Sequence, residues 1–190
     1  MSLPLPAKSD AQNALHEAGH AVAGYALRIP ILEVSLVPEE PGEDGYVRFS
    51  FAHNNPQDTS KRVEVFIKDI SGYAAERKAG YENLSGWGKT DKNNLERCIP
   101  ELKRRGVVKE GAEIDFLRWI KRQARALMDE NWAAVQKFAE VLKEKRRMSG
   151  MKAEQLCEAL GVQRRNDDSL LARWFAEQEA RQNQKGSLNP

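Results

Sequence analysis

The chain has 190 residues, 31% of them charged, and a formal net charge of +2 from 30 basic and 28 acidic side chains. This length suffices for one domain with a sizeable core. The near balance of charge argues against nucleic acid as a partner. The 2 cysteines exclude a disulfide framework, and no apolar run approaches the ~20 residues that span a bilayer. We therefore expect a cytoplasmic protein without a membrane segment.

The first regular element predicted is a helix over about 10–27, after an irregular lead-in at residues 1–9. Ser9, or the residue after it, can cap this helix, and apolar residues recur along it with an amphipathic helical period. Gly19 and Gly24 each weaken a helix by about 1 kcal/mol relative to alanine. We expect another element to approach closely at these glycines, which would make the helix buried and central.

This helix contains the sequence His16-Glu17-Ala18-Gly19-His20, which has the form H-E-x-x-H. Residues four apart lie on one helix face, with Cβ atoms about 5–6 Å apart, so both imidazoles can bind one metal ion. Zinc suits them, and it lowers the pKa of a bound water from 15.7 to about 7. Glu17 can then accept the proton of that water as it attacks a carbonyl group.

A β-hairpin is predicted next, because apolar residues alternate with polar ones over 31–37 and 45–51. Its edge strand could hold an extended peptide through backbone hydrogen bonds. The loop that follows contains His53, which we leave out of the site. A second helix is predicted over about 61–78, ending near Gly80.

A zinc site with two histidines needs a third protein ligand and leaves one position for water. Asp91 is our first candidate, with Glu76 and Asn94 as alternatives. Asp91 begins a helical stretch over 91–98, where it could also serve as an N-cap. Pro100 is expected to bend or end that stretch.

The remainder is predicted to be helical. Two apolar stripes indicate two helices that meet near Asn131, and Ser149-Gly150 interrupts the chain. A short helix over 151–160 follows and Gly161 closes it; the last amphipathic segment leads into a frayed end at 180–190. The apolar residues of the stripes and of the last segment are Phe116, Leu117, Ile120, Ala124 and Leu127; Val135, Phe138, Ala139 and Leu142; and Leu170, Leu171, Trp174 and Phe175.

These features resemble the peptidase domain of the FtsH family of ATP-dependent zinc metalloproteases, over about residues 12–160. The motif at 16–22 is the sharpest part of the resemblance. The similar segments are His-Glu-Ala-Gly-His-Ala-Val at 16–22, Glu33-Val-Ser-Leu-Val-Pro38 with Gly45-Tyr46, Ser71-Gly72-Tyr73-Ala74-Ala75-Glu76 (the family has Gly-Gly-Arg-Ala-Ala-Glu), and the closing segment from Leu127 to Met148.

The resemblance also bears on the third ligand. In the family an aspartate ligand follows a Ser-Thr-Gly-Ala-x-Asn segment, and Ser85 to Asp91 has the same length from serine to aspartate. An alternative alignment on Leu95-Glu96-Arg97 would place Asn94 at the ligand position. With Asp91 as the ligand, Glu76 would support the site or pack beside it. The implied site has the metal ligands His16, His20 and Asp91 and the general base Glu17.

The fold implied is α+β and mainly helical, with a zincin-like metal helix, a small β-hairpin or sheet and a C-terminal helical bundle. The peptidase domain would span 10–162, followed by a C-terminal helix and frayed tail over 163–190. Family members carry membrane segments and an AAA ATPase on the same chain, and this sequence has neither. It would be a soluble zinc endopeptidase that cleaves unfolded protein or peptides, alone or with a separate ATPase, and it could form a homo-oligomer. The alternative is an FtsH-like protein-binding module without hydrolytic activity.

Overall fold

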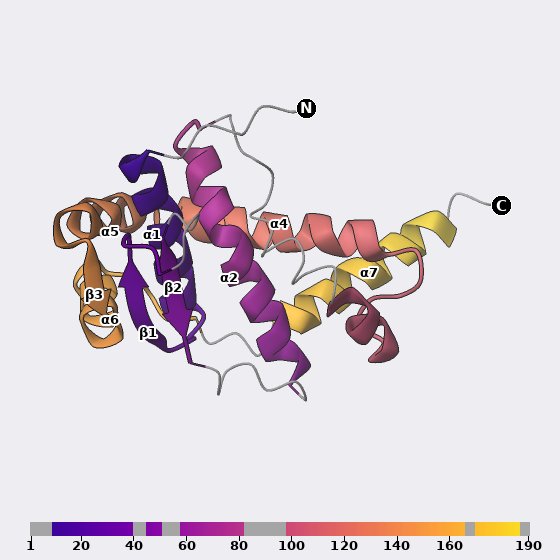
Figure 1. Ribbon diagram of the computed structural model, residues 1–190. Helices are drawn as coiled ribbons and strands as arrows, with labels where there is room; N and C mark the ends of the chain where they lie inside the picture. Colours follow the sequence, from indigo (N-terminus) through magenta and orange to yellow (C-terminus); the bar gives the residue numbers. More distant parts are fainter. Residues whose placement is uncertain (1–8, 40–44, 51–57, 82–97, 166–169, 187–190) are drawn as a thin grey trace, which may run out of the picture.

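The computed structural model describes residues 9–39, 45–50, 58–81, 98–165 and 170–186. The described chain is mainly helical with a small three-stranded antiparallel sheet, which agrees with the predicted α+β class (Figure 1). No helix among these residues has the length and hydrophobicity to cross a membrane. The elements are α1 (Asp10–Ala26), β1 (Ile31–Ser35), β2 (Tyr46–Phe49), α2 (Thr59–Lys78), α4 (Glu113–Glu130), α5 (Trp132–Lys145), β3 (Arg147–Ser149), α6 (Gly150–Ala159) and α7 (Leu170–Gly186).

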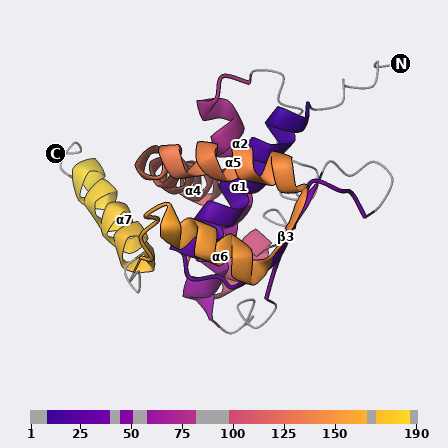
Figure 2. The ribbon, with the colours of Figure 1, turned by 90° about the vertical axis from the view of Figure 1, so that its left-hand side faces the viewer.

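Helix α1 is the central element, as predicted. Ser9 caps it, because the Ser9 hydroxyl accepts a hydrogen bond from the backbone N–H of Gln12 at 3.2 Å. Helix α2 packs on one side of α1 and α5 on another, and the sheet also contacts it (Figures 1 and 2). Most of α1 from Ala14 onward is buried, so the motif lies inside the domain rather than on an exposed helix.

The two glycines of α1 lie where other elements approach it closely, which confirms the expectation. A Cβ atom on Gly19 would lie 2.7 Å from the Ser71 carbonyl oxygen and 3.0 Å from the Cα atom of Gly72 on α2. A Cβ atom on Gly24 would clash with the ring of Phe49 on β2. The glycines therefore allow α2 and β2 to reach the backbone of α1.

The sheet has the order β2-β1-β3. The predicted hairpin is confirmed in a shorter form, with β1 antiparallel to β2. Strand β3 was not predicted; those residues were assigned to the closing helices and the break after them. At three residues it is too short for the alternation of a strand to be recognised in the sequence. Arg146 ends α5 with a φ of 61°, and its carbonyl oxygen accepts a hydrogen bond from the N–H of Leu36 at 2.8 Å, just before β3 begins.

The C-terminal half confirms the helix junction at Asn131 and the closure of α6 at Gly161. Pro100 does not end the helical segment, because residues 98–104 are helical across it; the rest of the predicted stretch, 91–97, lies outside the described residues. Helix α7 also continues to Gly186, farther than the frayed end that we predicted at 180–190.

Helix α7 packs against α4 through an aromatic cluster. Trp174 is buried, and its ring centroid lies 5.1 Å from that of Phe116 and 5.6 Å from that of Trp119. The Trp174 indole N–H donates to the Val107 carbonyl oxygen at 2.7 Å. Phe175, which we placed in the same apolar segment, is instead 42% exposed.

We predict that Gly19→Ala destabilises the protein, although alanine is the better helix former. The added methyl group would meet the backbone of α2, and overpacking of this kind lowers the free energy of unfolding by about 1–3 kcal/mol. Urea denaturation measures this, with Gln136→Ala at an exposed position of α5 as the control. A more stable Gly19→Ala variant would contradict the close approach of the two helices.

Candidate metal centre

Helix α1 brings the imidazoles of His16 and His20 together on its side that faces α2. The two Nε2 atoms are 3.0 Å apart. The ring centroids are 4.6 Å apart and the ring planes are nearly perpendicular, at 83°. The spacing of four residues therefore gives the convergence of ring nitrogens expected from the motif.

Each imidazole is held at its other nitrogen, Nδ1, by a group on α2. The Nδ1 atom of His20 lies 2.8 Å from the Lys68 carbonyl oxygen. Because a carbonyl oxygen only accepts, this contact requires the proton of His20 on Nδ1. The Nδ1 atom of His16 lies 2.8 Å from Oε1 of Glu76. Among the described residues neither of these two atoms has a hydrogen-bond partner, so the contact is an ion pair in which Glu76 acts on the ring through its charge.

These contacts set the chemistry of the two Nε2 atoms. A carboxylate or carbonyl oxygen beside Nδ1 favours the tautomer that leaves the Nε2 lone pair available as a ligand. The 3.0 Å contact between the two Nε2 atoms is a hydrogen bond when His16 carries its proton on Nε2. When both rings carry their protons on Nδ1, the two Nε2 lone pairs converge and can bind one cation. His16 and His20 could therefore hold a metal ion, and the buried Glu76 supplies the carboxylate behind one of them.

Gly72 on α2 lies directly against the imidazole pair. A Cβ atom there would be 2.5 Å from Nε2 of His20 and 2.9 Å from Nε2 of His16. No role was predicted for Gly72 beyond its place in the segment that resembles the FtsH family. Its position in the interior of a predicted helix could have indicated this contact, because such a glycine usually marks a place where another part of the chain comes close to the helix backbone.

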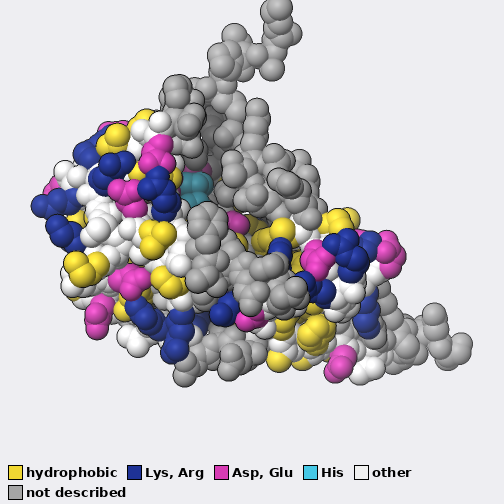
Figure 3. All heavy atoms as spheres, turned by 60° about the horizontal axis from the view of Figure 1, so that its bottom comes forward, with side chains coloured by type: hydrophobic (Ala, Val, Ile, Leu, Met, Phe, Trp, Pro, Cys, Tyr) yellow, Lys and Arg dark blue, Asp and Glu magenta, His cyan; other side chains and the backbone are white. Residues whose placement is uncertain are grey.

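The carboxylate of Glu17 faces the beginning of β2. Glu17 is 5% exposed, and a Cβ atom on Gly45 would lie 3.3 Å from its Oε1 atom. Histidine side chains are visible at the surface (cyan in Figure 3), and the side chain of His16 is 13% exposed. The imidazole pair is thus accessible while the neighbouring carboxylate is mostly enclosed.

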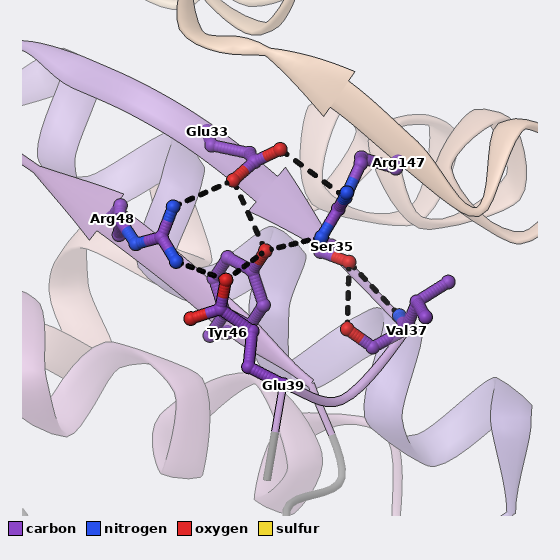
Figure 4. A network of polar contacts seen from close by, with 7 residues as sticks. All are labelled: Glu33, Ser35, Val37, Glu39, Tyr46, Arg48 and Arg147. Atoms are coloured by element: carbon purple, nitrogen blue, oxygen red, sulfur yellow. Dashed lines mark hydrogen bonds and ion pairs between the residues drawn. The ribbon is translucent and has the colours of Figure 1, made fainter.

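A polar network on the sheet anchors the beginning of β2 (Figure 4). The Tyr46 hydroxyl donates to Glu33 of β1 at 3.0 Å and accepts from Arg147 of β3 at 2.7 Å. Arg48 donates to the same Glu33 carboxylate at 3.0 Å. Burial and the hydrogen bond to Glu33 raise the pKa of Tyr46, so its hydroxyl stays protonated. The network ties all three strands together next to Gly45.

The contacts described above concern the two histidines and Glu17, and the third ligand is a separate question. Glu76 lies on the Nδ1 side of His16, away from the converging Nε2 atoms, which fits a supporting group better than a ligand. Asp91 and Asn94, like His53, lie outside the described residues. Within the described segments, no group of three or more His, Cys, Asp or Glu side chains is arranged to hold a metal ion.

No protein-family model matches the chain, and a search of curated proteins finds no match.

We predict that Glu76→Gln weakens Zn²⁺ binding about 10–100-fold, the usual effect of removing a carboxylate that orients a histidine ligand. The substitution keeps the shape of the side chain and removes its charge. Competition with a chromophoric chelator measures the affinity. Glu130→Gln, at an exposed ion pair with Arg165, is the matched control; equal affinities for both variants would contradict the role of Glu76.

Proposed function

We propose that this chain is a zinc-dependent endopeptidase of the HExxH type, with His16 and His20 as metal ligands and Glu17 as general base. The observation that carries the proposal is the convergence of the two Nε2 atoms, while both Nδ1 atoms face oxygen atoms of α2. The resemblance of residues 12–160 to the FtsH peptidase domain supports the same function.

The distances fit a shared zinc ion. Zinc binds histidine nitrogen at about 2.0–2.1 Å, so two nitrogens on one ion lie no more than about 4 Å apart. The Nε2 atoms of His16 and His20 are 3.0 Å apart, within that limit. When bound, zinc would supply a Lewis acid that polarises a carbonyl group and lowers the pKa of water from 15.7 to about 7.

Glu17 is the residue that the motif assigns to proton transfer. Glu17 follows His16 directly in the sequence. Its carboxylate lies beside Gly45, at the beginning of β2. It can accept a proton from a water that attacks a peptide carbonyl, and then deliver that proton to the leaving amine. Its burial keeps bulk water from competing for the carboxylate.

Strand β2 suits the binding of an extended substrate. It is an edge strand of the sheet, and an edge strand can bind an extended peptide by adding it to the sheet. Because Gly45 immediately precedes β2 and lies beside Glu17, a peptide paired with this strand would pass close to the carboxylate. Unfolded protein or peptides are therefore the substrates that we propose, delivered by a separate ATPase where one is present.

We predict that Glu17→Gln retains zinc and loses peptidase activity by about 10²–10⁴-fold, the range for removal of a general base. Cleavage of fluorescent casein and zinc content by mass spectrometry are measured on the same samples. Glu158→Gln, exposed on α6, is the matched control. Undiminished cleavage by Glu17→Gln would contradict the mechanism, and a folded parent protein that binds no zinc would favour the protein-binding module instead.

The variant Asp91→Asn distinguishes between two possible roles of Asp91, that of a metal ligand and that of a helix cap. Asparagine caps a helix about as well as aspartate but lacks the anionic oxygen that zinc prefers. Loss of a residue that only supports a ligand lowers metal affinity about 10–100-fold. We predict a larger loss of zinc affinity for Asp91→Asn and no change for Asn94→Ala. The reverse order of effects would assign the ligand position to Asn94.

A further inference from the structure

A second candidate site lies between α2 and α4, where the C-terminal half of α2 crosses α4 (Figure 1). A cavity of about 280 Å³ opens there, close to the lower end of the range of small-molecule pockets. Its lining combines an apolar part with charged groups: Ala74, Arg77, Lys78, Arg125, Met128 and Asp129.

The described residues that line this cavity carry a net positive charge. Lys78 forms an ion pair with Asp129, so these two charges offset each other. Arg77 and Arg125 remain, and within the described part of the chain neither has an acidic partner at ion-pair distance. One arginine comes from each helix, so the two guanidinium groups approach the cavity from its two walls.

A further basic residue lies beside Arg125 on α4. Lys121 lies one helical turn before Arg125 on α4, and burial together with the Arg125 guanidinium lowers the pKa of Lys121. An anion in the cavity would offset this repulsion. A guanidinium group can bind phosphate through two parallel hydrogen bonds, and two arginines can bind one phosphate in this way from two directions.

We propose that the cavity between α2 and α4 binds a small phosphate-bearing anion through Arg77 and Arg125. Ala74 and Met128 provide apolar surface for the organic part of a phosphate monoester. The site lies on the α4 side of α2, whereas Gly72 and Glu76 face the imidazole pair. The proposal therefore does not depend on peptidase activity.

Calorimetric titration of the full chain with inorganic phosphate and with phenyl phosphate, at constant ionic strength, tests this site. We expect saturable binding. Arg77→Gln or Arg125→Gln should each raise the dissociation constant at least about tenfold, because the loss of one charge-assisted hydrogen bond changes the binding free energy by an amount that corresponds to this factor. Arg118→Gln is the matched control, since this exposed arginine lies on α4 and pairs with Asp115.

Tighter binding of phenyl phosphate would identify an organic phosphate as the ligand, and equal binding would identify free phosphate. The arginines are exposed, so the variants should unfold at the parent's temperature in phosphate-free buffer, which a thermal scan verifies. Three results would overturn the proposal: no saturable binding, equal weakening by Arg118→Gln, or tighter binding of succinate than of either phosphate.

Discussion

Helices α1 and α2 meet through backbone atoms at Gly19 and Gly72, and this contact places the imidazole pair. With side chains at these positions the helices would have to separate, because each added Cβ atom would lie 3.0 Å or less from atoms of the other helix. The short separation brings the Lys68 carbonyl and the Glu76 carboxylate within 2.8 Å of the two Nδ1 atoms. A backbone carbonyl has two lone pairs, so Lys68 can accept a bond from His20 as well as take part in its helix.

The same arrangement gives the two carboxylates different positions. Glu76 lies behind an imidazole, on the side away from the converging nitrogens. Glu17 faces the beginning of β2, next to Gly45. The polar network around Tyr46 fixes that end of the strand against its two neighbours in the sheet. In our proposal the first carboxylate orients a ligand and the second transfers a proton, and their surroundings differ accordingly.

Several features followed from local sequence. The motif helix, its Ser9 cap and the need for close neighbours at Gly19 and Gly24 could be predicted, because they rest on helical period, capping and the cost of glycine in a helix. Other features depend on tertiary structure. Strand β3 forms only because it pairs with β1, and the partners of the imidazoles come from residues 48 and 60 positions away in the sequence. No local pattern indicates which carbonyl or carboxylate will reach a given ring.

Helix α2 joins the candidate metal centre to the basic cavity, because Glu76 and Arg77 are consecutive residues that serve different sites. X-ray absorption spectroscopy of the zinc-loaded chain tests the candidate metal centre most directly. We predict a four-coordinate zinc with two histidine nitrogens at about 2.0–2.1 Å and oxygen at the remaining positions, with the histidine scattering weakened in His16→Ala and in His20→Ala. A zinc spectrum without histidine scattering, or one unchanged in both variants, would contradict the account.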